Sequence, residues 1–325
     1  MKLLVTGGAG YVGSVTSRLL LDAGHEVVVL DNLSTGFREA VAPDATFVEA
    51  DIADAGEILT PGAGFDAVLH FAGLIAAGES MLKPELYWDH NVQRSLRLLE
   101  AVRAAGVGKF VFSSTAAVYG NPTEIPITEN AVKAPTNTYG ATKLTFDFAL
   151  TSEAFAHGLA AVSLRYFNVA GALIRPEGGD VGERHDPETH IIPIALQVAA
   201  GKRPQLQLFG DDYPTKDGTC VRDYIHVEDL ARAHLLALDA ATAKEHRIYN
   251  LGTGSGFTNR EVVEVAREVT GAELPVEVAP RREGDPATLV ASSALARAEL
   301  GWVPQKTTLH DMIGDAWAFY RAHVA

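Results

Sequence analysis

Residues 6–13 read TGGAGYVG and place glycines at Gly7, Gly10 and Gly13, directly after an apolar run at residues 3–5. The G-x-x-G-x-x-G spacing allows a tight turn, lets the backbone approach a pyrophosphate, and lets the next helix pack closely on the strand. The N-terminus of that helix then faces the phosphates with its unpaired N–H groups. The stretch therefore predicts a strand, a phosphate-binding turn and a helix.

Further short β-branched runs follow in the first half of the chain, and they alternate with segments of helical periodicity. Strands that alternate with helices form a parallel sheet covered by helices on both faces. We expect strands at residues 3–5, 27–30, 46–48, 67–71, 109–112 and 161–164, and helices at residues 11–23, 91–105 and 138–156.

The alternation stops after about residue 170, where loops rich in Gly, Pro and Asp separate shorter elements. Such loops suit the lining of a site better than the extension of a sheet. We predict a Rossmann-type, doubly wound α/β domain at residues 1–170 and a smaller substrate-binding lobe at residues 171–325. Residues 221–250, with a helix at 228–241, should pack back on the first domain.

Composition excludes several classes of function. The 325 residues carry a formal net charge of −14, which disfavours nucleic acid and anionic membranes as partners. An apolar run of about 18 residues is missing, and the first run is too short for a signal peptide. Cys220 is the single cysteine, which excludes an internal disulfide and fits a reducing compartment. We expect a soluble, cytoplasmic protein.

The end of the second predicted strand indicates which dinucleotide binds. Asp31 lies 18 residues after Gly13, where a carboxylate can accept hydrogen bonds from both adenosine ribose hydroxyls. Its charge would repel the 2′-phosphate of NADP, so the position favours NAD. The nearby Arg38 weakens that preference, because an arginine could accommodate the phosphate.

Residues 138–143 read TYGATK and place Tyr139 one helical turn before Lys143. Such a pair can be an ordinary surface contact, but beside a cofactor it has a chemical use. A cation about 6 Å from the phenol, at an effective dielectric constant of about 20, favours the phenolate by roughly 2.8 kcal/mol, or about two pKa units. The pair is therefore a candidate general base with its electrostatic partner.

The chain is similar to a known superfamily, and the motifs that carry the similarity span the predicted first domain. The glycine loop, Asp31-Asn32-Leu33, Asp51-Ile52, Phe71-Ala72-Gly73, Ser113-Ser114-Thr115 and Tyr139-x-x-x-Lys143 resemble the extended short-chain dehydrogenases/reductases. The stretches FAGLIAAGES, SSTAAVYG, RYFNVAGA, LFGDDYPTKDGTCVRDYIHVEDLA and RREGDPA resemble the UDP-glucose 4-epimerase (UDP-galactose 4-epimerase) family within it.

This resemblance implies a catalytic group of Tyr139 as base, Lys143 as its partner and Thr115 as hydrogen-bond donor to the reacting sugar hydroxyl. It also implies tightly bound NAD. The residues implied in NAD binding are Gly7, Gly10, Tyr11, Val12, Gly13, Asp31, Asn32, Asp51, Ile52, Phe71, Ala72, Gly73, His90, Ser113, Tyr139, Lys143 and Tyr166.

The implied reaction is reversible 4-epimerisation of UDP-galactose and UDP-glucose, with hydride transfer through a 4-keto sugar. Two helices, at 91–105 and 138–156, resemble the family's dimer surface and imply a homodimer with a four-helix bundle. The residues implied in substrate binding are Thr115, Tyr139, Phe167, Asn168, His190, Ile191, Gln207, Phe209, Arg222, Tyr224, Arg282, Asp285 and Leu289.

Three positions depart from the family pattern, and a fourth bears on substrate preference. Ile75 stands where some members have a lysine, and His90 and His190 stand where others have asparagine. Leu289 aligns with a position that gates the sugar pocket, which predicts a preference for hexoses without a 2-acetamido group. We predict no metal, because His185 and His190 show no third ligand at a suitable spacing.

Three other functions share parts of this pattern. Sugar-nucleotide dehydratases resemble one another in having acidic residues directly after the catalytic threonine, whereas Ala116 and Ala117 follow Thr115 here. A 4-epimerase of another UDP-sugar, such as an N-acetylhexosamine, a uronate or a pentose, uses the same residues. A non-catalytic NAD sensor could keep the glycine loop, but it would not need Thr115, Tyr139 and Lys143 together.

Overall fold

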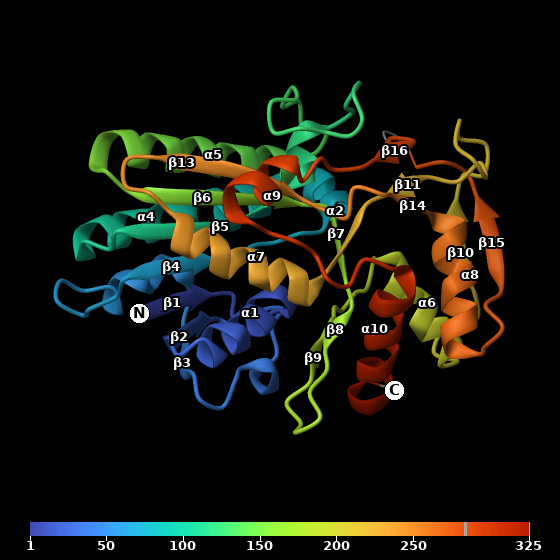
Figure 1. The fold of residues 1–325 in the computed structure, drawn as a ribbon, viewed down its shortest axis with the longest axis horizontal. Helices are drawn as coiled ribbons and strands as arrows, with labels where there is room; N and C mark the ends of the chain where they lie inside the picture. The colour runs from blue at the N-terminus through green and yellow to red at the C-terminus, as the bar shows by residue number, and fades with distance from the viewer. Residues whose placement is uncertain (283–284, 325) are drawn as a thin grey trace.

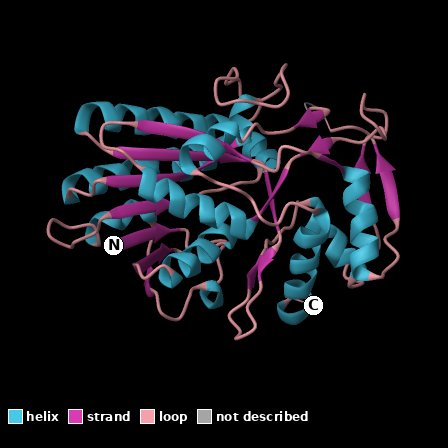
Figure 2. Cartoon of the chain, in the orientation of Figure 1, coloured by secondary structure: helices cyan, strands magenta, loops and turns pink. Residues whose placement is uncertain are grey.

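A computed structural model describes residues 1–282 and 285–324. Its main feature is a parallel sheet of seven strands in the order β13-β6-β5-β4-β1-β2-β3, with helices on both faces (Figures 1 and 2). The predicted doubly wound α/β fold is confirmed. The strands are β1 Lys2–Thr6, β2 Glu26–Asp31, β3 Thr46–Glu49, β4 Ala67–His70, β5 Lys109–Thr115, β6 Ala160–Tyr166 and β13 His246–Leu251.

Successive residues of each strand enter different cores, because side chains alternate across a sheet. On β1, Leu3 and Val5 pack with one set of helices, while Leu4 packs with another. Both faces of the sheet are therefore buried, as parallel sheets require. The first set is α1 (Tyr11–Asp22), α7 (Val227–Ala240) and α9 (Ala294–Leu300), and the second includes α4 (Arg94–Ala105) and α5 (Thr138–His157).

Helix α5, which carries the Tyr139/Lys143 pair, begins and ends on local signals. The side chain of Asn137 accepts a hydrogen bond from the Gly140 amide at the N-terminus, and Gly158 ends the helix with a left-handed φ of 80°. Helix α4 begins at Arg94, three residues later than predicted, because residues Asp89–Gln93 form a π-helical turn (η3). Such turns are frequent at functional sites.

Other short elements join the first-lobe strands and helices. They are η1 (Arg38–Ala40), η2 (Ile52–Glu57), α2 (Ala77–Leu82), α3 (Pro84–Trp88) and η4 (Ala116–Tyr119).

The seventh strand comes from a distant part of the sequence. Strand β13 pairs in parallel with β6, from His246 against Ala161 to Leu251 against Tyr166. Helix α7 precedes it and packs against α1, so both elements return to the first lobe after the chain has entered the second. The sequence predicted the helix but not this strand.

The second lobe has a core of its own, formed by three helices and a two-stranded parallel sheet of β10 and β15. Figure 1 shows these elements beside the carboxyl ends of the main strands. No helix among the described residues is both long and apolar enough to cross a membrane. The lobe contains β7 Asn168–Ala170, β8 Ala172–Leu173, β9 Val181–Gly182, α6 Ile191–Ala199, β10 Leu206–Phe209, β11 Val221–Arg222, β12 Tyr224–His226, β14 Phe257–Thr258, α8 Asn259–Thr270, β15 Val276–Ala279, β16 Thr288–Leu289 and α10 Leu309–His323.

Candidate active site

The glycine loop after β1 has the geometry that a bound pyrophosphate needs. Gly7 has a φ of 73°, and a Cβ there would collide with the backbone of Ala72. A Cβ on Gly13 would collide with the carbonyl of Gly7, so the helix could not approach the turn. Gly10 caps α1 without a side chain, which leaves the first-turn amides available to an anion. These residues fit the diphosphate of a dinucleotide.

The carboxylate of Asp31 lies at the end of β2 and is only 8% exposed. One of its oxygens accepts from the Ala9 amide at 2.9 Å, and the other accepts from the Leu33 amide at 2.8 Å. These bonds fix the carboxylate against the glycine loop and leave lone pairs for ribose hydroxyls. The guanidinium of Arg38 lies 4.3 Å from the centre of the Phe47 ring, over its face.

A second carboxylate, Asp51, lies beside the same strand ends. It accepts from the Ala53 amide at 2.9 Å, from Asn32 at 3.1 Å, and from the guanidinium of Arg94. Partial burial alone would raise the pKa of Asp51, but the Ala53 amide and Arg94 hold it below the ordinary value. Asp51 and Asn32 are thus ordered at the edge where the adenosine is predicted to bind.

Lys143, one turn after Tyr139 on α5, is buried, with 4% of its surface exposed. Its ammonium donates to the carbonyl of Ser113 at 3.0 Å and lies 4.8 Å from the centre of the Phe112 ring. Burial lowers the pKa of Lys143 to about 8, against the opposing effect of Asp147. At neutral pH the side chain is therefore mostly cationic, but it can lose its proton at mildly alkaline pH.

The phenol of Tyr139 has a raised pKa, because burial disfavours its anion and a hydrogen bond with Thr115 offsets this only in part. The sequence argument expected the opposite direction, from the charge of Lys143. Its arithmetic contained the attraction to the cation but omitted the cost of burying the phenolate. The protein groups alone therefore do not activate Tyr139, and the positive charge of the nicotinamide would have to contribute.

Asn91, in the π-helical turn η3, is a positioning residue that the sequence analysis missed. Its side-chain oxygen accepts from the Leu74 amide at 2.8 Å, and its amide group donates to the Leu74 carbonyl at 3.0 Å and to Thr142 at 3.2 Å. The buried side chain therefore ties the loop after β4 to α5, one residue from Lys143. Periodicity gave no signal for it, since the wider turn changes which face it occupies.

His70, at the end of β4, was also missed. It contacts the hydroxyl of Thr6 at 2.6 Å and that of Ser95 at 3.1 Å. Burial and the nearby charge of Lys143 lower its pKa to about 3, so the ring is neutral. Of these two neighbouring buried side chains, Lys143 is therefore the one that carries the positive charge.

The remaining predicted cofactor residues line the same strand ends. The hydroxyl of Tyr11 donates to the Gly171 carbonyl at 2.6 Å and joins the glycine loop to the second lobe. The hydroxyl of Tyr166 bonds to that of Ser113. His90 lies in η3 with its ring 4.0 Å from Asp89. Others occupy α1, η2 and the loop after β4, namely Val12, Ile52, Phe71, Ala72 and Gly73.

Two arginines of the second lobe lie where the substrate is predicted to bind. Arg222, on β11, donates to Asp285 at 3.0 Å and to the Pro286 carbonyl at 2.8 Å. The guanidinium of Arg282 lies 3.8 Å from the centre of the Phe209 ring. The motif RREGDPA supplies Arg282 and Asp285, but its Glu283 and Gly284 lie outside the described residues.

Leu289 on β16 pairs with Arg222 on β11, and it packs against a cluster that contains Ala116, the residue after Thr115. The predicted sugar gate thus lies beside Arg222 and packs on the cluster that follows Thr115 in the sequence. Phe167 packs on the same cluster. Gln207 lies on β10, beside Glu277.

The chain crosses between the lobes at β7 and β12. Asn168 pairs with Tyr224 in the ladder, and its amide group donates to the Asp223 carbonyl at 3.0 Å. Burial raises the pKa of Tyr224, and this phenol is buried. His190 precedes Ile191 at the start of α6. The sequence argument that the histidines lack further ligands was wrong, because Glu183 and Glu188 lie beside His185 and His190.

A glycine-lined dinucleotide turn, a buried carboxylate at the second strand and a Tyr-x-x-x-Lys pair define a nicotinamide-dependent enzyme of the doubly wound class. The model of the NAD dependent epimerase/dehydratase family matches residues 3–252, and the chain belongs to this family. Among curated proteins it is similar to the UDP-glucose 4-epimerase of Corynebacterium glutamicum, with 58% identity over 99% of this chain and 96% of that protein. It is 55% identical to the UDP-glucose 4-epimerase of Streptomyces lividans, over 99% of this chain and 97% of that protein.

Solved structures agree with these relatives. A crystal structure of UDP-glucose 4-epimerase has a TM-score of 0.95 and 47% identity, and the match covers 99% of this chain and 98% of that one. The Brucella ovis UDP-glucose 4-epimerase, solved in complex with NAD, has a TM-score of 0.93 and 44% identity, covering 98% of each chain. The predicted family, its NAD cofactor and the assignment as a UDP-glucose 4-epimerase are confirmed.

Proposed function

We propose that the chain interconverts UDP-galactose and UDP-glucose, and that Tyr139, Lys143 and Thr115 carry the reaction. The observation that supports this most is their arrangement at the carboxyl ends of the parallel strands. Lys143 extends from α5, and its buried ammonium lies beside the loop that follows β4. Thr115 ends β5 within hydrogen-bonding reach of Tyr139. Ligands of open α/β sheets bind at these strand ends.

NAD, held by the glycine loop and Asp31, would supply a reversible hydride acceptor for C4 of the sugar. Tyr139 accepts the proton of the 4-hydroxyl as C4 is oxidised and returns it as the 4-keto sugar is reduced. Lys143 stabilises the phenolate, and Thr115 orients the reacting oxygen. Since the two half-reactions cancel, there is no net change in redox state and the cofactor need not leave.

The second lobe, residues 171–325 in this proposal, holds the UDP part while the hexose turns. Arg222 and Arg282 present guanidinium groups that suit phosphate oxygens, because the planar fork can donate two parallel bonds. In this proposal Asp285 contacts the uridine ribose and Phe209 the base. With the nucleotide held at one end, the sugar can expose either face of C4 to the 1–170 domain.

Other substrates remain within the same chemistry. Solved neighbours include the UDP-Glc/GlcNAc 4-epimerase of Campylobacter jejuni, at 40% identity and a TM-score of 0.85. In this proposal the half-buried Leu289, which packs on the cluster that includes Ala116, restricts the room for a 2-acetamido group and so favours the unsubstituted hexoses. Elimination of water is disfavoured, because Ala116 and Ala117 offer no acid after Thr115.

We further propose a cytoplasmic homodimer in which α4 and α5 of each copy form a four-helix bundle. The support is an apolar surface on these helices, where Leu96, Phe148 and Phe155 are 41%, 63% and 90% exposed. Large exposed aromatic side chains on one face mark interaction surfaces. Sedimentation velocity should give a dimer for the wild type and a shift towards monomer for Phe148→Asp with Phe155→Asp, and a monomeric wild type would contradict the bundle.

The test of the activity is conversion of UDP-galactose to UDP-glucose by the purified protein without added NAD. We expect turnover, copurified nicotinamide, and some reduced cofactor absorbing in the near ultraviolet after exposure to a UDP-sugar. A fully active protein that contains no nicotinamide would refute the proposed mechanism.

A further inference from the structure

Four potential metal ligands meet between β9 and α6, at Glu183, His185, Glu188 and His190. The Nδ1 of His190 is 2.9 Å from Glu183 and 3.0 Å from Glu188, and the Nδ1 of His185 is 3.1 Å and 3.6 Å from the same carboxylates. A tetrahedral ion with ligand bonds of about 2.1 Å has ligand-to-ligand edges of roughly 3.4 Å. One ligand atom from each of the four residues lies within 4.8 Å of the others, so small side-chain shifts would bring them to such a tetrahedron.

The buried carboxylates of this cluster also favour a positive charge between them. The side chains of Glu183 and Glu188 are 9% and 2% exposed, and two buried carboxylates in contact with the same rings repel each other. Among the described residues, no lysine or arginine forms an ion pair with either of them. The adjacent Arg184 points elsewhere, since it pairs with Glu39 and lies 4.3 Å from the centre of the Phe37 ring.

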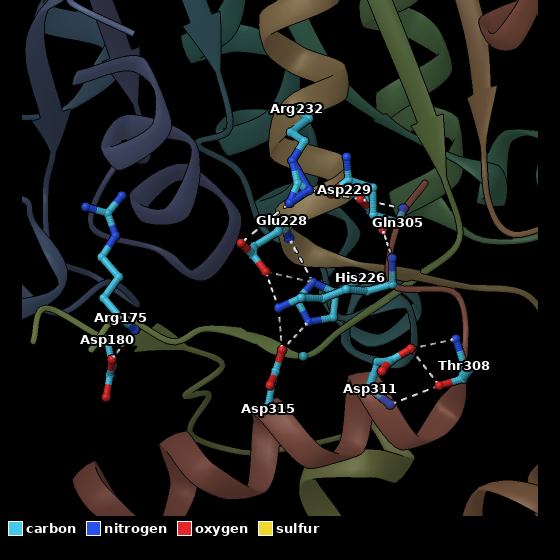
Figure 3. Close-up of polar contacts among 12 residues, drawn as sticks. Arg175, Asp180, His226, Glu228, Asp229, Arg232, Gln305, Thr308, Asp311 and Asp315 are labelled. Carbon is cyan, nitrogen blue, oxygen red and sulfur yellow. Dashed lines mark hydrogen bonds and ion pairs between the residues drawn. The ribbon is translucent and has the colours of Figure 1, made fainter. Parts of the chain in front are cut away.

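A second cluster of potential metal ligands consists of His226, Glu228 and Asp315 (Figure 3). Here the ammonium of Lys306 pairs with both carboxylates, at 2.6 Å from Asp315, so a cation of the protein already balances them. Such a cluster does not need an ion, whereas the cluster at residues 183–190 has no corresponding lysine within the described part of the chain.

We propose that Glu183, His185, Glu188 and His190 bind one divalent transition-metal ion of the zinc class in a tetrahedral Glu₂His₂ site. With neutral imidazoles, the two carboxylates exactly balance the charge of the ion. Glu188 is also pre-organised, because one of its oxygens accepts from the amides of Thr189 and His190 at 2.7 Å and 2.8 Å. The histidines are 23% and 41% exposed, which leaves the ion a path from solvent.

The site would fix the segment between β9 and α6 of the second lobe. His185 borders a small cavity next to Gly10 and Tyr11 of the glycine loop, and His190 begins α6 of the second lobe. A bound ion would hold this segment against the cofactor loop, which makes it a structural clamp. The reaction needs no step at the metal.

Metal content measures the site independently of activity. The untagged full-length protein, incubated with Zn²⁺ and freed of excess, should retain about one ion per chain and melt at a higher temperature than after chelation. His190→Asn, which removes one ligand but keeps a polar side chain, should lose the retained zinc. The matched control His310→Ala removes an exposed His–Glu pair and should retain it.

A further readout separates a built site from adventitious zinc. Co²⁺ in the site should show the intense visible bands of tetrahedral coordination, and these should vanish in His190→Asn. His185→Asn should remove the same bands, because it deletes the second imidazole ligand. Wild-type protein without retained zinc, or equal retention in His190→Asn, would overturn the proposal and leave two protonated histidines as the balancing charges.

Discussion

In the proposed mechanism, the first lobe carries out the chemistry and the second lobe binds the nucleotide. The proposed catalytic residues Thr115, Tyr139 and Lys143 lie on β5 and α5 of the first lobe. The substrate contacts proposed for Arg222 and Leu289 lie on strands of two residues each in the second lobe. Turnover and substrate choice should therefore respond to mutations in different lobes.

Tyr139→Phe should lower kcat about 10² to 10⁴-fold, because it removes the general base while changing the volume little. UDP binding, measured by calorimetry, should stay at the wild-type value. Tyr320→Phe, on α10 of the second lobe, is the matched control and should keep wild-type turnover. Near-normal kcat in Tyr139→Phe would show that another group takes the proton.

Lys143→Ala should move the pH profile of kcat as well as reduce its value. The cation favours the phenolate, so its loss raises the apparent pKa of Tyr139 and shifts the activating limb to higher pH, by up to about two units. The wild-type profile should flatten or fall above the pKa of Lys143, which is about 8. Lys133→Ala serves as control, and an unshifted profile in Lys143→Ala would contradict the coupling.

Arg222→Ala should raise KM for UDP-galactose while kcat changes little, because the guanidinium is proposed to hold the diphosphate and not the reacting carbon. Hydrogen bonds to charged groups contribute about 1.5–3 kcal/mol, which corresponds to roughly 10 to 150-fold in KM. Arg281→Ala is the neighbouring control, since this exposed side chain pairs with Asp212. A decrease in kcat without a change in KM would contradict the proposal that the second lobe acts in substrate binding and not in the chemical step.

Leu289→Ser should raise kcat/KM for UDP-N-acetylgalactosamine relative to UDP-galactose by about 10-fold, since a few heavy atoms of relieved overlap are worth 1–3 kcal/mol. Leu289→Met keeps the bulk and should leave the ratio unchanged. If the wild type already uses both substrates equally well, or the serine variant shows no relative gain, Leu289 is not the gate.

The same division explains what the sequence could predict. Short-range patterns predicted the glycine loop at residues 6–13, the position of Asp31 and the strands of the first lobe. Each of these depends on local spacing or on apolar runs that are buried on both faces of the sheet. The pairing of β13 with β6 was not, since it joins residues about 80 positions apart through a ladder that short-range patterns cannot specify. The raised pKa of Tyr139 also escaped, because burial by distant residues does not appear in an i, i+4 pair.

In the second lobe, sequence motifs indicated candidate residues but not the residues that they contact in the fold. The RREGDPA stretch supplied Asp285, yet its bond to Arg222 spans 63 positions. Glu183 and Glu188 carried no signal, because their closeness to His185 and His190 depends on how the segment before α6 folds back. Asn91 was hidden by the wider π-helical turn, which breaks the 3.6-residue period used to assign faces.

The late return of β13 has a consequence for how the protein is made on the ribosome. When Tyr166 at the end of β6 has left the exit tunnel, the strand that will cover that edge begins at His246 and has still to be translated. At about 5–20 residues per second, the intervening 80 residues take roughly 4–16 s. During this interval the nascent chain presents an unpaired, apolar strand edge, which is a template for aggregation. Synthesis of the second lobe is therefore a period in which a chaperone would have a specific edge to shield.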